Sequence, residues 1–173
     1  DGSLRDVQVT VQRLEVNGLE YLHCTYRDIT ARKEAERTLA LYANIFRHSG
    51  EAIMVTDHDN HIIAINPACE RLTGYSLEDL RGRDPKILSS GRTPPETYQG
   101  MWSALKQAGF WQGELWDRRK DGAIYPKWAA ISCIRIEQDK VSHYIASFTD
   151  MSERKAAEER IDFLAHHDAL TGL

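Results

Sequence analysis

A repeated segment constrains this chain more than any other feature. Residues 26–37 recur as residues 148–159 at an offset of 122, and each copy runs from an aromatic residue and an Asp into a charged, helix-forming stretch. Residues 1–4 likewise echo residues 121–124, where Asp-Gly precedes a β-rich stretch. Self-similarity at a fixed spacing indicates one structural unit used twice. We therefore predict that residues 1–28 are the C-terminal strands of a preceding domain, of the same kind as a complete domain at residues 43–150.

Between the two copies the pattern is that of an α+β domain. Two short apolar runs flank a turn cluster at residues 57–60, which is typical of a hairpin. Asn66, Ser76 and Thr93 each precede residues that favour the start of a helix. Three longer β-rich stretches follow, at about residues 111–119, 123–136 and 140–149. This order predicts a five-stranded antiparallel sheet with helices on one face, among them a long helix over residues 94–108.

Charged stretches at residues 29–48 and 151–167 flank this domain and are predicted to be long linker helices. Each carries apolar residues at a heptad-like spacing: Ala35, Leu39, Tyr42 and Phe46 in the first, and Ala157, Ile161 and Leu164 in the second. Either each helix packs on its own domain, or the two stripes form the seam of a parallel homodimer. We favour the dimer seam, because a monomer would leave both stripes partly in contact with water.

Composition excludes several classes of protein. The net charge is −4 and no basic residues cluster, which argues against a nucleic-acid partner. No apolar run reaches the roughly 18–20 residues of a membrane span, so no membrane contact is expected within this chain, although an anchor elsewhere in a longer protein stays open. The three Cys are scattered without a CxxC pair and the His are dispersed, so we predict no metal site and a cytoplasmic, reducing location.

Three motifs resemble the PAS domain family. Residues 57–75, with Asn-Pro-Ala and Thr-Gly-Tyr, are similar to the opening of such a domain. Residues 111–122, with Trp-Gln-Gly-Glu and Arg-Arg-Lys-Asp-Gly, are similar to its later strand and hairpin. Residues 150–155 are similar to the closing motif that precedes an output helix. The resemblance covers about residues 43–150 and implies a PAS fold with a sensory role.

The last ten residues, 164–173, resemble the segment that opens GGDEF domains, the diguanylate cyclases that make cyclic di-GMP. The resemblance implies that a GGDEF domain starts at residues 168–173 and that residues 151–167 form the output linker to it. This chain itself shows no paired carboxylates, nucleophile–base set or phosphate loop, so it is predicted to be regulatory and not an enzyme. The longer protein is predicted to be a diguanylate cyclase, and a following phosphodiesterase domain stays open. The alternative function is a ligand-free dimerisation and spacer module among several PAS units.

The resemblance also implies three modes of cofactor binding in the space between sheet and helices. Covalent FMN needs a Cys after Gly-Arg-Asn, and Pro85 stands at that position. Haem-binding PAS domains supply a His from the long helix, and residues 94–108 contain none. Residues 87–102 are similar to the FAD-binding PAS domain of the nitrogen-fixation redox regulator, and Trp102 occupies a flavin-contacting position of that family. Covalent FMN and haem are therefore disfavoured, and FAD stays open.

Three positions depart from the FAD-binding pattern. Met54 stands in place of a polar serine, Pro85 in place of a glutamate and Asp117 in place of a flavin-facing asparagine. An ionised Asp only accepts hydrogen bonds, whereas Asn both donates and accepts. With Trp102 and Lys127, these three residues make up the candidate ligand pocket.

Asp117 needs a partner, because an unpaired buried charge is costly. If the hairpin closes with Gly122 at its centre, Lys127 lies directly opposite Asp117, a cross-strand pair worth about 0.2–1 kcal/mol. A two-residue loop would instead put Lys127 out of line. We predict that the pair occupies the pocket wall where a flavin edge would lie, which favours an empty or otherwise filled pocket over FAD.

Overall fold

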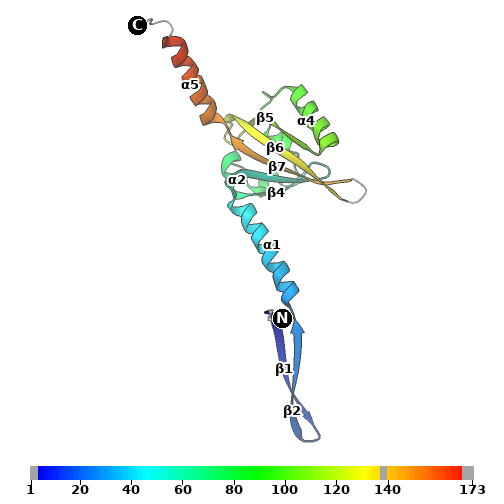
Figure 1. Ribbon diagram of the computed structural model, residues 1–173. Coiled ribbons are helices and arrows are strands. Elements are labelled where there is room, and N and C mark those ends of the chain that lie inside the picture. Colours follow the sequence, from blue (N-terminus) through cyan, green and yellow to red (C-terminus); the bar gives the residue numbers. More distant parts are fainter. Residues whose placement is uncertain (1–3, 137–139, 169–173) are drawn as a thin grey trace. The chain divides into compact units, whose positions relative to one another are not determined.

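The computed structural model describes residues 4–136 and 140–168, and it divides the chain into two compact units. The hairpin unit extends to Ile45 and the sheet unit begins at Phe46. The sheet unit contains β3 (Ala52–Asp57), β4 (Ile62–Ile65), α2 (Pro67–Thr73), α3 (Leu77–Leu80), the 3-10 helix η1 (Pro85–Leu88), α4 (Pro95–Ala108), β5 (Phe110–Arg118), β6 (Ile124–Ile136), β7 (Lys140–Asp150) and α5 (Ser152–Asp168) (Figure 1).

The sheet unit is built on one five-stranded sheet in the order β4-β3-β7-β6-β5. Every neighbouring pair in it is antiparallel. Helix α4 packs against β5 and β6, and α2 packs against β3. The predicted α+β class, with a five-stranded antiparallel sheet and a long helix beginning near residue 94, is confirmed.

Two predicted helix starts are present with their hydrogen bonds. The side chain of Asn66 accepts a hydrogen bond from the Cys69 N–H, and α2 ends at Gly74 in the left-handed conformation. Ser76 and Asp79 form the reciprocal pair of a capping box at the start of α3. Asn66 also accepts a hydrogen bond from the Ile53 N–H at 2.9 Å, so this side chain ties α2 to β3.

The predicted register of the β5–β6 hairpin is wrong. Asp117 lies opposite Tyr125, and Lys127 lies opposite Leu115. Arg119 and Ala123 close a three-residue loop, in which Gly122 is the last residue and takes a φ of 92°. A loop of this length commonly places its left-handed residue last, so the hairpin is centred one residue before Gly122. The resulting shift along β6 is two residues, and an even shift keeps every side chain on its predicted face.

The core lies between the inner face of the sheet and its covering helices. Its buried apolar residues include Ala52 and Met54 of β3, Leu88 of η1, Leu115 of β5 and Phe148 of β7. They come from alternate positions of their strands, as expected for a sheet with only one face against the core. This inner face also forms the floor of the candidate site.

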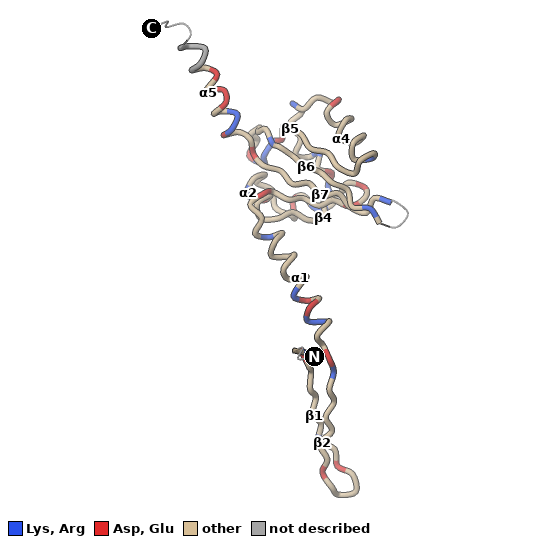
Figure 2. Tube along the Cα trace, in the orientation of Figure 1, with Lys and Arg blue, Asp and Glu red and all other residues tan. Residues whose placement is uncertain are grey.

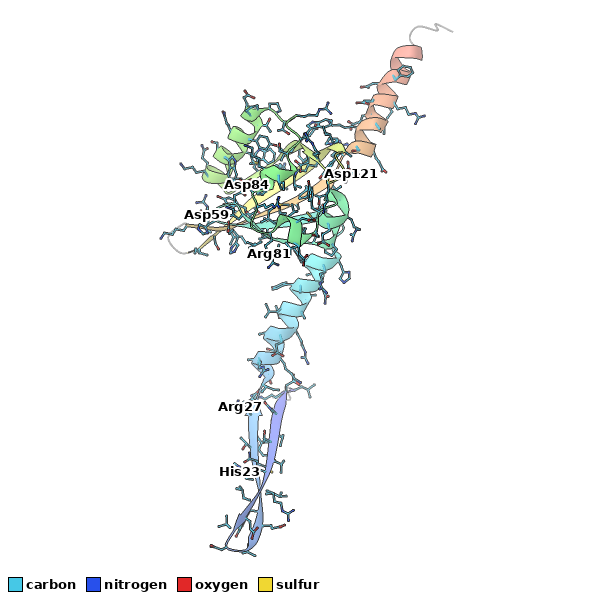
Figure 3. All side chains as sticks on the ribbon, turned by 180° about the vertical axis from the view of Figure 1, so that it is seen from behind. His23, Arg27, Asp59, Arg81, Asp84 and Asp121 are labelled. Atoms are coloured by element: carbon cyan, nitrogen blue, oxygen red, sulfur yellow. The ribbon has the colours of Figure 1, made fainter. Side chains whose placement is uncertain are left out.

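The hairpin unit contains β1 (Val7–Val16), β2 (Leu19–Asp28) and most of α1 (Thr30–His48). The two strands pair antiparallel with each other, and all of their residues are exposed. His23 and Arg27 lie on one face of the hairpin (Figure 3), and Val9, Val11 and Tyr26 lie on the other. The origin of these strands in a preceding PAS domain stays a prediction.

Both predicted linker segments are helical. Acidic and basic residues are interspersed along the described part of α5 (Figure 2). In α1, Ala35, Leu39 and Tyr42 are exposed and Phe46 is half-buried. Ala157 and Ile161 of α5 are exposed, whereas the side chain of Leu164 and residues 169–173 of the expected GGDEF start lie outside the described residues. The dimer seam therefore stays a prediction.

Candidate ligand-binding cavity

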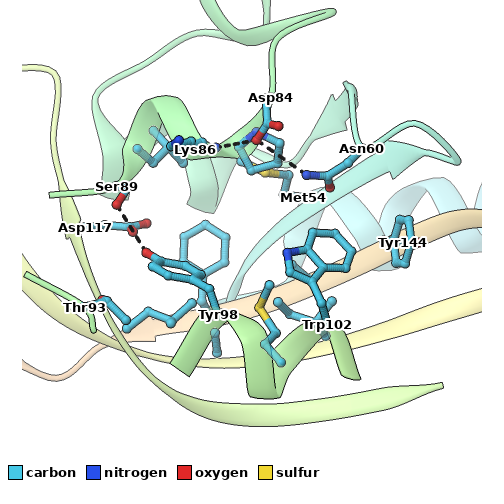
Figure 4. A pocket seen from close by; sticks show the side chains of 18 of the residues that line it. Met54, Asn60, Asp84, Lys86, Ser89, Thr93, Tyr98, Trp102, Asp117 and Tyr144 are labelled. Atoms are coloured by element: carbon cyan, nitrogen blue, oxygen red, sulfur yellow. Dashed lines mark hydrogen bonds between the residues drawn. The ribbon is translucent and has the colours of Figure 1, made fainter. Parts of the chain in front are cut away.

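A cavity of about 660 Å³ lies between the inner face of the sheet, η1 and α4. This volume is typical of small-molecule sites in proteins. Most of its lining is apolar and comes from β3, β5, β6, β7, η1 and α4. Figure 4 shows Tyr98 and Trp102 of α4 pointing into the cavity, with Asp117 of β5 at one side.

All five residues of the sequence-predicted pocket line this cavity. They are Met54, Pro85, Trp102, Asp117 and Lys127. They belong to β3, η1, α4, β5 and β6, respectively. The fold therefore brings together positions that are up to 73 residues apart in the chain. Their role in binding a ligand stays a prediction.

Asp117 and Lys127 form a buried ion pair at the cavity wall, as predicted. Lys127 Nζ lies 2.5 Å from Asp117 Oδ2, and the two residues are 8 % and 3 % exposed. They are diagonal and not direct neighbours, and the even register shift keeps them on one face, within reach of a long side chain. Burial raises the pKa of the Asp117 carboxyl, and Lys127 partly offsets that effect.

The geometry of this pair leaves hydrogen-bonding capacity unused. Among the described residues, Asp117 Oδ2 accepts no hydrogen bond of good geometry despite its close ionic contact. Lys127 Nζ also lies 4.2 Å from the centroid of the Phe148 ring, which adds a cation–π contact. An ammonium group has three N–H donors that point in different directions, so Asp117 on one side of Lys127 cannot receive all of them.

Several other polar side chains of the lining have protein partners. Ser89 Oγ and Tyr98 OH share a hydrogen bond at 3.2 Å (Figure 4). Asn60 Nδ2 donates to Asp84 Oδ1 at 3.5 Å, and Thr93 Oγ1 accepts from the Trp116 N–H at 2.8 Å. Among the buried side-chain nitrogen and oxygen atoms of the described lining, Asp117 Oδ2 is the one without a hydrogen bond.

Sequence reasoning missed Tyr144 of β7 as a lining residue. Its ring meets Trp102 edge to face, with the two centroids 5.5 Å apart. Tyr144, Ala146 and Phe148 all line the cavity, because alternate residues of a strand share a face. The parity of β7 could have identified Tyr144 once Phe148 was assigned to the inner face.

The residues present do not fit the FAD contacts that the resemblance implies. Of the four positions compared with that pattern, only Trp102 carries the expected residue. Met54 and Pro85 offer no strong hydrogen-bonding group, and Asp117 presents a carboxylate where the pattern has an amide. A flavin would therefore find no hydrogen-bonding partner at Met54 or Pro85.

The cavity wall continues into the start of α5. Asp150, the last residue of β7, accepts a hydrogen bond from the Ser152 N–H at 2.7 Å and pairs with Arg119. Burial raises the pKa of Asp150, but the Ser152 hydrogen bonds and the Arg119 guanidinium outweigh this effect and hold it below its usual value. Lys127 is the cross-strand partner of Asp150.

A second contact fixes the first turn of α5 against the outer face of the sheet. Lys155 Nζ lies 2.5 Å from Glu114 Oε1 and 5.0 Å from the centroid of the Trp116 ring. The Met151 N–H donates to the Pro126 carbonyl at 2.9 Å. The strands that line the cavity therefore also hold the N-terminus of α5.

The family model of the PAS domain matches residues 50–153. This chain belongs to the PAS domain family. The PAS domain of a protein from Colwellia psychrerythraea has a similar structure, with a TM-score of 0.63 and 28% sequence identity over 67% of this chain and 98% of that one. The cavity of this chain lies within the residues that the family model matches.

Two curated relatives are signalling proteins. A nitrogen fixation regulatory protein of Klebsiella oxytoca is 37% identical over 121 residues, which cover 70% of this chain and 24% of that protein. The aerotaxis receptor of Escherichia coli is 26% identical over 103 residues, 59% of this chain and 20% of the receptor. The chain thus spans about a quarter or less of these relatives. As a PAS domain, the chain is a regulatory, sensory module of signal transduction.

Two features are absent from the part of the chain that the structure describes. No helix in residues 4–136 and 140–168 is long and apolar enough to cross a membrane. Within the same ranges, no group of three or more His, Cys, Asp or Glu side chains could hold a metal ion.

Proposed function

We propose that this PAS module senses a small molecule in the cavity and regulates a C-terminal diguanylate cyclase through α5. The observation that carries the proposal is that β6 and β7 both line the cavity and contact the start of α5. Both strands line the cavity, and β7 leads directly into α5 through Asp150. The resemblance of residues 164–173 to the start of GGDEF domains supports a cyclase as the output.

The proposed route of the signal runs from the ion pair to the helix start. A ligand that moves Lys127 acts on the strand position opposite Asp150. Asp150 holds the first turn of α5 through Ser152 and is itself held by Arg119. A switch of this kind needs an element with two arrangements that the sensor can bias, and α5 is that element.

We further propose that the active form is a homodimer joined through α1 and α5. The supporting residues are the apolar positions of the predicted seam: Ala35, Leu39, Tyr42, Phe46, Ala157, Ile161 and Leu164. Leu39, Tyr42 and Ile161 are large and exposed in the single chain. Two cyclase domains must face each other around their two-fold symmetric product, so a dimeric linker could bring them together.

A ligand-free spacer within a series of PAS units is the second candidate. The hairpin unit favours it, because β1 and β2 repeat the pattern of β6 and β7. A spacer has no need of a charged pair in its interior, since such pairs are often no more stable than apolar residues of the same volume. The buried pair at a cavity of about 660 Å³ therefore favours the sensor.

Cyclic di-GMP synthesis tests the cyclase output. The full-length protein that contains this chain should convert GTP into cyclic di-GMP, measured by chromatography of the products. Insertion of seven residues after Glu159 of α5 keeps the phase of the seam, whereas insertion of four rotates it. We expect a severalfold change of rate only for the four-residue insertion. No cyclic di-GMP would contradict the cyclase, and equal effects of both insertions would contradict the seam.

A further inference from the structure

We infer that the cavity selects an uncharged, largely aromatic ligand with one amide-like end, and that Asp117 and Lys127 determine this selectivity. The inference rests on the proposed sensing function and names the chemical class of its ligand. It follows from the charge balance of the wall, from its unused hydrogen-bonding capacity and from the aromatic side chains of the lining.

The charge balance disfavours ionic ligands. Of the described lining residues, Asp117 and Lys127 are the charged ones that are buried, whereas Asp84 and Lys86 are exposed. The buried pair has no net charge, and each member already has its counter-ion at 2.5 Å. A lone carboxylate or ammonium would lose its hydration on entry and find no unpaired charge to replace it.

The unused hydrogen-bonding capacity defines the polar end of the ligand. Lys127 has donors beyond the one that faces Asp117, and Asp117 Oδ2 accepts no well-formed hydrogen bond from the described residues. An adjacent carbonyl and N–H satisfies both groups, since Lys127 donates to the carbonyl and Asp117 accepts from the N–H. A primary amide has this arrangement and carries no charge.

The lining defines the body of the ligand. Tyr98, Trp102, Tyr144 and Phe148 bring four aromatic rings to the cavity. Trp102 and Tyr144 meet edge to face. A ligand ring that makes similar contacts gains binding free energy beyond that of its buried area. Met54 adds a flexible, polarizable side chain that adapts to a flat ring. An aromatic ring system with a short amide arm matches these walls.

A matched series of indoles tests the charge preference. Indole-3-acetamide, indole-3-acetate and tryptamine share one ring and differ mainly in the charge of the arm. Isothermal titration calorimetry of the 173-residue chain near neutral pH should show the amide binding at least about tenfold more tightly than either ion. Equal or tighter binding of the acetate or of tryptamine would overturn the inference, as would failure of all three to bind.

Replacement of the pair by apolar residues tests its role. Asp117→Leu with Lys127→Met should fold, because such replacements of buried ion pairs are often neutral or stabilising. In this variant 3-propylindole, which has an apolar arm, should bind more tightly than indole-3-acetamide, whereas the unmodified chain should bind indole-3-acetamide more tightly. An unchanged preference for the amide would overturn the role of the pair.

A single substitution gives a second, directional test. Asp117→Asn leaves Lys127 as an uncompensated cation, so the preference should move from indole-3-acetamide toward indole-3-acetate. Circular dichroism establishes whether the variant is folded, and the apolar double variant decides the matter if it is not. These binding tests do not involve cyclic di-GMP, so their failure would remove the ligand class and leave the proposed cyclase output to its own assay.

Discussion

The β1–β2 and β6–β7 hairpins carry related sequence patterns but differ in their surroundings. Val9 pairs with Tyr26 in one, and Ala129 pairs with Phe148 at the corresponding positions of the other. Tyr26 is 69 % exposed and Phe148 only 2 %. Alternation along a strand therefore predicts which residues share a face, but not what covers that face. A two-stranded hairpin by itself is at most marginally stable in water, so β1–β2 contributes little to the stability of this chain.

The largest expected loss of stability follows from substitution at a position where one hairpin has a buried charge and the other an exposed apolar residue. Lys127 of β6 corresponds to Val7 of β1. Lys127→Val would leave the Asp117 charge buried without a partner and should lower the free energy of unfolding by about 4 kcal/mol near neutral pH. Val7→Ala, at an exposed position, should change it by no more than about 0.5 kcal/mol. Urea denaturation of the 173-residue chain measures both.

The loss caused by Lys127→Val should depend on pH. Burial already raises the pKa of Asp117, and removal of Lys127 raises it further. Ionisation of Asp117 then costs the folded state free energy as the pH rises above the unfolded value of about 3.9. The deficit should therefore be smaller near pH 4 than near neutral pH. A deficit that is the same at both would contradict the buried-charge explanation.

A matched pair of aromatic truncations gives the next largest effect. Phe148→Ala should lower the free energy of unfolding by about 3 kcal/mol, because it removes a buried ring from the core. Tyr26→Ala, at the corresponding position of β2, should lower it by about 0.5 kcal/mol or less. The midpoint of thermal unfolding is a convenient measure. Comparable losses would mean that the hairpin unit has a core of its own.

Replacement of the Asp residue that precedes each linker helix should change the free energy of unfolding by a smaller amount. Asp150 caps α5 through Ser152 and pairs with the half-buried Arg119, whereas Asp28 caps α1 through Thr30 and pairs with the exposed Arg5. Asp150→Asn should cost about 1–2 kcal/mol in urea denaturation near neutral pH. Asp28→Asn should cost less. The reverse order would show that α1 depends on its cap more than α5 does.

Asp28 and Asp150 should make the folding stability depend on pH in the same direction. The pKa of Asp28 is lowered by its hydrogen bonds from Thr30, and that of Asp150 also lies below its usual value. Each carboxylate therefore stabilises the folded state above its unfolded pKa of about 3.9, and this stabilisation is lost as the pH falls through the lower, folded value. Carboxyl NMR titration of the two side chains should place both midpoints below the unfolded value.

The smallest expected effect concerns flavin. Asp117→Asn with Lys127→Ala restores the amide of the resemblance and removes the competing cation. This variant should retain more FAD through purification than the unmodified chain, although Met54 and Pro85 still limit its affinity. The visible absorption spectrum measures the difference. FAD bound to the unmodified chain with Asp117 at the flavin edge would contradict the fit of the cavity described above.

Local signals predicted much of the fold. The caps at Asn66 and Ser76 and the helix from Pro95 follow from short-range chemistry, because a side chain there bonds to its own backbone neighbours or proline sets the first turn. The register of β5–β6 did not follow, since Gly122 can stand at the centre or at the end of a tight loop. The predicted register was wrong by two residues along β6. Because this number is even, Asp117 and Lys127 still share a face and form the predicted pair.

The cavity needed the tertiary structure. Sequence resemblance identified five lining residues but not Tyr144, because the parity of β7 places Tyr144 in the cavity only after Phe148 is assigned to the inner face, and the pairing of β7 with β3 and β6 provides that assignment. The exposed hairpin β1–β2 shows the opposite case, because its strand pattern is clear but does not determine what packs against it. Long-range contacts decide both outcomes, and neither the spacing nor the charge of residues within one strand encodes them directly.

The central claim is that the contents of the cavity control the output of α5. Ala146→Leu fills part of the cavity from β7, whereas Ala130→Leu makes the same change on the outer face of the neighbouring strand β6. The full-length protein should show a severalfold change in its rate of cyclic di-GMP synthesis for Ala146→Leu and a rate close to that of the unmodified protein for Ala130→Leu. Equal rates for the two variants, both folded by circular dichroism, would contradict the claim.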